Sequence, residues 1–114
     1  MTRNAPITQI EVEQEIMRLK ELLEEQTEIF ESLSIDAAKK EAAYDGGWAS
    51  AYLSATGSIK EREAWADYKM NEQNFEFKIS EALVKAKREK LSSIRTSMDS
   101  LRTIAANVRM SVNG

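Results

Sequence analysis

The chain has 114 residues, with one Pro and four Gly, which predicts a single domain with few turns. It contains neither Cys nor His. Because His is the commonest general base and metal ligand, its absence argues against most hydrolases and metalloenzymes. Without Cys there is no disulfide framework and no thiolate metal site. We therefore expect no catalytic residue, no metal site and no cofactor, and a protein that is not an enzyme.

Charge is distributed unevenly along the chain, although the formal net charge is only −3. Residues 8–36 hold nine acidic and two basic residues, whereas residues 83–114 hold seven basic and two acidic ones. This polarity has two compatible interpretations. Either the two ends pair with each other, within one chain or between chains, or the basic end binds a polyanion.

Residues 1–7 are expected to be a flexible leader. Residues 1–9 have neither the apolar core nor the cleavage site of a signal peptide, so no signal peptide is expected. No apolar run approaches the ~20 residues that a membrane helix needs. We expect a soluble, intracellular protein without membrane contact. A single helical domain is predicted over 8–114, beginning with a helix over about 9–33. Thr8 and Glu11 form a capping box at its start.

The first helix carries one regular apolar row, with alternating spacings of four and three residues. Its members are Val12, Ile16, Leu19, Leu23, Gln26, Phe30 and Leu33. That spacing is typical of a coiled-coil seam, in which the polar Gln26 would fix the register. We therefore assign oligomerisation to this row and to an apolar row near the C-terminus. The assigned residues are Val12, Ile16, Leu19, Leu23, Phe30, Leu33, Ile94, Met98 and Leu101.

A break is predicted at 34–36, and a second helix over about 37–55. The pair Gly46 and Gly47 predicts a bend or a close helix approach inside it, since each glycine costs ~1 kcal/mol relative to Ala. Gly57 is expected to end this helix, because glycine is the preferred residue after a helix C-terminus. Ser58 and Glu61 form a second capping box.

A long helix is predicted over about 59–110, which is too long for a compact monomer and indicates a helical hairpin or an assembly. Its predicted apolar row is Trp65, Tyr68, Glu72, Phe75, Ile79, Ala82 and Ala86, continued in a shifted phase by Leu91, Ile94, Met98, Leu101, Ala105 and Val108. The slip near 87–90 resembles a coiled-coil discontinuity. The fold class is therefore all-α, with long amphipathic helices in a coiled-coil-like hairpin, oligomeric bundle or ring.

Aromatic and basic residues supply the candidate binding groups. Tyr44, Trp48, Tyr52, Trp65 and Tyr68 form either a core cluster between helices or a platform on which single-stranded bases stack. The basic stretch 85–95 would line the accompanying groove. A row of arginines, Arg95, Arg102 and Arg109, recurs every seven residues and either pairs with the acidic helix or extends the basic surface.

A family resemblance adds to these patterns. The run 51–58, AYLSATGS, is followed by a charged helix, by ALVKA at 82–86 and by LSSIR at 91–95. This order resembles small phage recombination mediators of the UvsY-like type over about 37–110. That family places basic residues just before its Tyr segment, whereas the nearest basic pair here is Lys39 and Lys40. The resemblance implies a helical ring that binds single-stranded DNA and helps load a recombinase in the cytoplasm of an infected bacterial host. It also implies contact with the recombinase and with a single-strand-binding protein.

We therefore expect a homo-oligomeric recombination accessory protein that binds single-stranded DNA. The expected nucleic-acid-binding residues are Lys39, Lys40, Lys85, Lys87, Arg88, Lys90 and Arg95. The alternative is a structural coiled-coil adaptor, chaperone or virion-assembly protein that does not bind nucleic acid.

Overall fold

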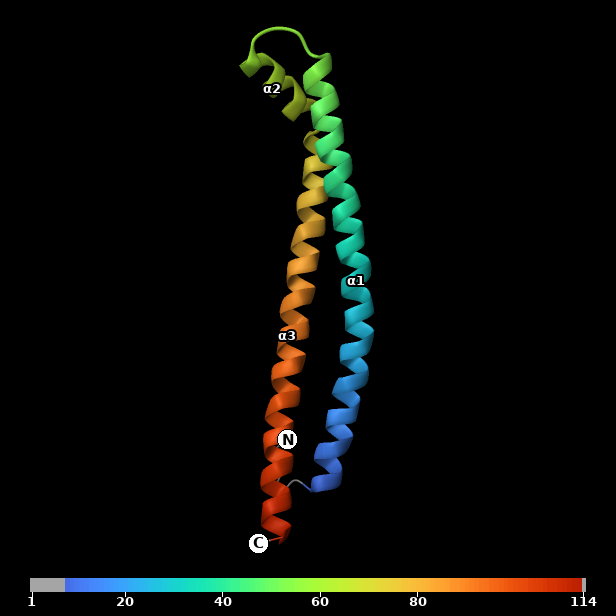
Figure 1. The fold of residues 1–114 in the computed structure, drawn as a ribbon, viewed down its shortest axis with the longest axis vertical. Helices are drawn as coiled ribbons and strands as arrows, with labels where there is room; N and C mark the ends of the chain where they lie inside the picture. The colour runs from blue at the N-terminus through green and yellow to red at the C-terminus, as the bar shows by residue number, and fades with distance from the viewer. Residues whose placement is uncertain (1–7, 114) are drawn as a thin grey trace. The chain divides into compact units, whose positions relative to one another are not determined.

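The chain is built from three helices, as Figure 1 shows. The computed structural model describes residues 8–113, among which it places α1 (Gln9–Ser54), α2 (Ile59–Lys69) and α3 (Asn71–Asn113) and no strand. The predicted all-α class is thus confirmed. The predicted leader, residues 1–7, lies outside the described residues.

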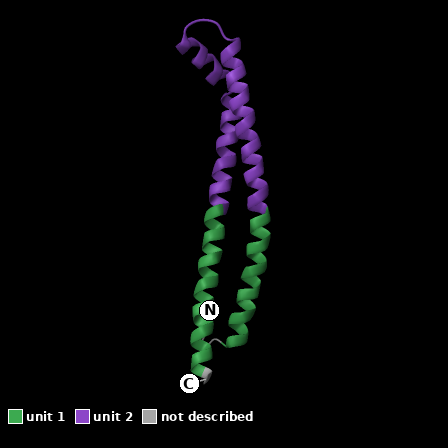
Figure 2. Cartoon of the chain, viewed as in Figure 1, with its two compact units in different colours: residues 1–28, 88–114 green, residues 29–87 purple. Residues whose placement is uncertain are grey.

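The helices form two compact units, coloured separately in Figure 2. Unit 1 takes Met1–Glu28 and Arg88–Gly114, and unit 2 takes Ile29–Lys87. In each unit, a segment of α1 and a segment of α3 run antiparallel. That these units form one domain stays a prediction.

The start of α1 follows the predicted capping box. The Thr8 hydroxyl accepts a hydrogen bond from the Glu11 backbone N–H at 3.2 Å, and the Thr8 N–H donates to the Glu11 carboxylate at 3.2 Å. Two donors that the first turn leaves without helical partners are thereby satisfied.

The predicted break at 34–36 is wrong, because α1 continues through it to Ser54. The Ser34 hydroxyl donates to the Phe30 carbonyl at 2.8 Å, so it bonds back into the helix instead of capping a new one. Asp36 pairs with Lys40 one turn later, at 3.1 Å. Burial also recurs without interruption, since Ala37 is as well covered as the residues before the supposed break. The helices predicted over 9–33 and 37–55 are one helix.

The two glycines inside α1 do not interrupt it, and one of them allows a close approach. A Cβ on Gly46 would meet nothing within 4 Å, whereas a Cβ on Gly47 would lie 2.9 Å from the Met70 Sδ and closer still to its Cε. Gly47 thus admits the Met70 side chain to the surface of α1. Of the two predicted outcomes, the close approach is the observed one.

The chain reverses between α1 and α2, where Gly57 has a φ of 109° that only glycine adopts readily. Ser58 then caps α2 by accepting a hydrogen bond from the Glu61 N–H at 3.2 Å, as predicted. The single helix predicted over 59–110 is wrong, because α2 ends at Lys69 and α3 begins at Asn71. Between them, Met70 has φ −106° and ψ 15°, far from helical values.

Unit 1 packs around large aliphatic side chains. Leu19 of α1 meets Ile94 and Met98 of α3, and Leu22, Leu23 and Leu101 pack against this cluster. Val12 and Ala105 are also buried. Burial of such side chains stabilises a fold by about 1.5–3 kcal/mol each.

Unit 2 packs around smaller side chains. Its buried residues are Ala37, Ala51, Ala66 and Ser80. The rings of Tyr44 and Phe77 stack across the two helices with centroids 6.3 Å apart. Small residues let helix axes approach closely, but they remove less apolar area from water.

The row of α3 that was predicted to be packed in unit 2 is exposed instead. Phe75 and Ile79 are 64% and 45% exposed, whereas Phe77, Ser80 and Val84 are buried or half-buried. The covered row continues to Leu91 at alternating spacings of three and four residues, so the predicted slip at 87–90 does not occur. The exposed phase is the more apolar one, because the covered phase contains Ser80 and Lys87 beside Phe77 and Val84. Packing against α1 selects the phase that includes Phe77.

The two glycines of α1 form a matched pair for testing the close approach of the Met70 side chain to Gly47. We expect Gly46→Ala to raise the free energy of unfolding by about 1 kcal/mol, because Ala favours helix over Gly by that amount. Gly47→Ala should gain less or lose stability, because the added Cβ displaces Met70. Urea unfolding followed by circular dichroism measures both. In a Met70→Ala background the two substitutions should become equal, and a difference that persists there would contradict the explanation.

Candidate functional site

The seven predicted nucleic-acid-binding residues lie in both units. Unit 2 holds Lys39, Lys40, Lys85 and Lys87, and unit 1 holds Arg88, Lys90 and Arg95. Lys40 and Lys87 are half-buried on the packed faces of their helices, and Lys40 is paired with Asp36. The other five are exposed. Among the described residues, Lys39, Lys85, Lys90 and Arg95 have no ion-pair partner within 4 Å.

The arginine row of unit 1 has a fourth member that the sequence analysis missed. Arg88 precedes Arg95, Arg102 and Arg109 at the same spacing of seven, and all four are exposed. Arg102 pairs with Asp99 at 3.0 Å, and the Arg109 Nε donates to the Ala105 carbonyl at 3.4 Å. The row is therefore a surface feature of α3 with part of its hydrogen-bonding capacity used inside its own helix.

The electrostatic surroundings of this row are mixed. The α1 segment of unit 1, residues 9–28, holds seven acidic and two basic residues, and the α3 segment, residues 88–113, holds five basic and two acidic ones. The contact of Leu19 with Ile94 places these segments side by side. Their opposite charges attract within the ~10 Å range of electrostatic interactions at 0.1 M salt. An approaching polyanion would be attracted by the basic segment of α3 and repelled by the acidic segment of α1.

The residues assigned to oligomerisation are covered within one chain. Val12, Leu19, Ile94 and Met98 are buried, and Ile16, Leu23, Phe30, Leu33 and Leu101 are half-buried. The antiparallel segments of α1 and α3 supply in one chain the partner that the sequence analysis sought in another copy. Their role between copies stays a prediction.

The five aromatic residues divide between the two predicted roles. Tyr44, Trp48 and Tyr52 are half-buried, with the last two stacked at 5.4 Å. The Trp48 Nε1–H also donates to the Asp67 carboxylate of α2 at 2.8 Å, which docks α2 on α1. Trp65 and Tyr68 instead are 45% and 76% exposed, with the Lys69 ammonium 5.9 Å from the Trp65 ring centre. The second pair is available to a ligand.

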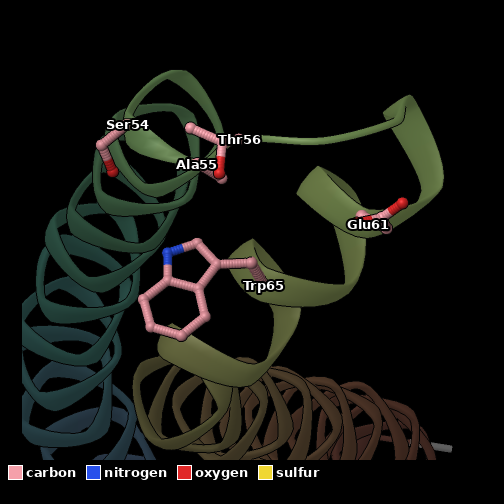
Figure 3. Close-up of a pocket in the computed structure, with 5 residues that line it drawn as sticks. All are labelled: Ser54, Ala55, Thr56, Glu61 and Trp65. Carbon is pink, nitrogen blue, oxygen red and sulfur yellow. The ribbon is translucent and has the colours of Figure 1, made fainter.

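A hollow of about 430 Å³ lies beside Trp65. Its lining residues are Ser54, Ala55, Thr56, Glu61 and Trp65, and Figure 3 shows the Trp65 indole turned toward the end of α1. Glu61 is its one ionisable residue, and that carboxylate accepts a hydrogen bond from the Ser58 hydroxyl at 3.1 Å. The hollow is therefore lined on one side by the Trp65 ring, and its only carboxylate is hydrogen-bonded to the cap residue Ser58.

A second exposed surface consists of apolar residues of α3 that the sequence analysis expected to be packed. Phe75, Ile79 and Leu83 of α3 are 64%, 45% and 49% exposed. With Ala82 and Ala86 they lie on the side of α3 that faces away from α1. The sequence does show these residues as an apolar row at helical spacing. It does not show whether this row or the row of Phe77 is covered by α1.

Docking of α2 can be tested through the Trp48–Asp67 hydrogen bond. We expect Asp67→Ala to lower the free energy of unfolding by about 1 kcal/mol, because it removes the acceptor of the indole N–H. Asp67→Asn should lose less, since its amide oxygen still accepts. Thermal unfolding followed by circular dichroism measures both. Equal stability of Asp67→Ala and the natural chain would show that this bond does not hold α2.

Three further observations concern the described residues as a whole. None of their helices combines the length and the apolar character needed to cross a membrane. Within residues 8–113, no three carboxylates lie close enough together to hold a metal ion. No family model, curated protein or solved structure matches the chain.

Proposed function

We propose that the chain is a homo-oligomeric recombination accessory protein that binds single-stranded DNA and assists in loading a recombinase. The proposal includes contact with that recombinase and with a single-strand-binding protein, in the cytoplasm of an infected bacterial host. The observation that carries it is the exposed pair Trp65 and Tyr68 beside Lys69 in unit 2. The sequence resemblance to phage recombination mediators supports the same function.

The chemistry of single strands explains why this pair matters. Proteins bind single-stranded nucleic acid by stacking bases on aromatic side chains and by holding phosphates with Lys and Arg. Large aromatic side chains are usually covered, so two exposed ones on an 11-residue helix point to a ligand. Lys85, in the same unit, is exposed and has no ion-pair partner among the described residues. Both required groups are therefore present in unit 2.

The second candidate is a structural helical adaptor that does not bind nucleic acid. It is favoured by the acidic α1 segment beside the arginine row in unit 1, which weakens the attraction of that row for phosphate. The exposed apolar residues of α3 also suit protein contacts. The two candidates differ in one measurable property, the affinity for single-stranded DNA.

Lys85→Glu should weaken binding of a labelled single-stranded oligonucleotide, measured by fluorescence anisotropy at low and at moderate salt. Each phosphate contact contributes about −0.7 to the slope of log affinity against log salt, so the variant should bind more weakly and with a shallower slope. Lys20→Glu is the matched control, because it makes the same charge change at another exposed lysine.

Two results would count against the assignment of Lys85. If Lys20→Glu weakens binding as much as Lys85→Glu does, only the net charge matters. If the natural chain does not bind even at low salt, the adaptor function is the better conclusion.

Tyr68→Ala should also weaken binding, because stacking contributes about 1–3 kcal/mol for each base. That range corresponds to a loss of at least about fivefold in affinity. Leu53→Ala is the control, since it removes an equally exposed apolar side chain of unit 2, 79% against 76%. An anisotropy titration compares the two variants, and unchanged affinity in Tyr68→Ala would remove this ring from the binding surface.

A further inference from the structure

One face of α3 in unit 2 carries an apolar row that the described residues 8–113 leave exposed. We define the outer stripe as Phe75, Ile79, Ala82, Leu83 and Ala86, all of them exposed. Four of these residues, Phe75, Ile79, Ala82 and Ala86, follow each other at spacings of four, three and four. That spacing is the repeat by which helices pack along a straight seam.

The outer stripe lies on the side of α3 opposite its buried row. Phe77 and Val84 face α1, and the Phe77 ring stacks on Tyr44. At 100° per residue, Phe75 and Ile79 lie about 160° from Phe77 on the helix. This part of α3 therefore has two apolar faces, of which α1 covers one. Contiguous apolar surface of this kind marks an interaction site.

We propose that the outer stripe is covered by the same stripe of a second copy, with the two α3 helices antiparallel. The order of side-chain sizes gives the orientation. Large Phe75 and Ile79 occupy the N-terminal half, and small Ala82 and Ala86 occupy the C-terminal half. In an antiparallel pair centred between 80 and 81, Phe75 lies level with Ala86 of the second copy, and Ile79 lies level with its Ala82.

A parallel pair would not pack as evenly. It would set the large rings against each other at one end and leave the alanines apart at the other. In the antiparallel pair, each large residue meets a small one, so the distance between the helices stays constant along the contact. Uniform packing of this kind retains the dispersion contacts that a gap would lose.

Charge at the borders of the outer stripe favours the same orientation. Glu72 and Glu76 border its N-terminal end, and the exposed Lys85 borders its C-terminal end. Lys78 and Glu81, between them, have opposite charges. An antiparallel copy sets Glu76 of each stripe level with Lys85 of the other, whereas a parallel copy sets Glu76 level with Glu76 and Lys85 level with Lys85. The surface is therefore complementary to itself, as a two-fold interface requires.

The first test is the mass in solution, measured by light scattering without DNA. We expect the natural chain to have at least twice the monomer mass and the double variant Phe75→Ser with Ile79→Ser to have the monomer mass. Because both side chains are exposed, circular dichroism should show unchanged helix content. The control is Ile35→Ser with Leu53→Ser, which removes two exposed apolar residues of unit 2 outside the stripe and should keep the mass of the natural chain.

Two results of this test would overturn the proposal. A natural chain with the monomer mass would assign the stripe to a different protein. An unchanged mass in the stripe variant would place the contact between copies elsewhere. The proposal deepens the homo-oligomer of the proposed function, and because DNA is absent its failure is separate from a failure of DNA binding.

The second test measures the orientation by cross-linking, for which the absence of Cys gives a clean background. Phe75→Cys and Ala86→Cys chains, mixed under oxidising conditions, should form a disulfide between them, because a disulfide requires Cα atoms within about 7 Å. Neither variant alone should cross-link. Cross-linking of Ala86→Cys with itself would overturn the antiparallel arrangement, and so would the absence of any cross-link in the mixture.

Discussion

The fold depends on the packing of α1 against α3 through side chains that recur every three or four residues. In α1 the buried or half-buried positions continue from Val12 past Leu33 to Ala51 without a change of phase. That regularity keeps one face of a long helix turned toward its neighbour. It also explains why a polar residue such as Ser34 does not end the helix. The hydroxyl bonds to its own helix, and the packed face continues beneath it.

Polar residues within the packed faces are accommodated in ways that preserve this regularity. Ser80 is 3% exposed, and its hydroxyl donates to the Glu76 carbonyl at 3.0 Å. Gln26, the polar member of the predicted seam, is 8% exposed and makes a polar interaction. Buried polar groups cost little when they are paired. The Ser80 bond lies within α3, so it satisfies the hydroxyl without a partner on α1.

Some of the fold could be read from the sequence, because the signal was local. Both capping boxes require residues three apart. The box at Thr8 has both of its bonds, and at the second box Ser58 accepts the Glu61 N–H. The row that includes Leu19 was also readable, because its residues alternate at spacings of four and three. The covered face of α3 could not be predicted near Phe75 and Phe77, because the more apolar phase there is the exposed one and only the position of α1 selects the other. Among the candidate site residues, exposure could be predicted for Lys85 but not for Lys40 or Lys87, which fall on the packed phase.

The short interruption at Met70 gives unit 2 two separate surfaces instead of one. In an uninterrupted helix, Trp65, Tyr68, Phe75 and Ile79 would share one face, because their spacings fit a single heptad row. Met70 departs from helical geometry, and Gly47 admits its side chain to α1, so α2 leaves the line of α3 (Figure 1). The aromatic pair on α2 is thereby separated from the outer stripe on α3. One surface combines rings with a lysine and suits stacked bases, and the other is apolar and self-complementary and suits a second copy. Because Trp65 and Tyr68 lie outside the outer stripe, an assembled protein would keep its aromatic pair free for a ligand.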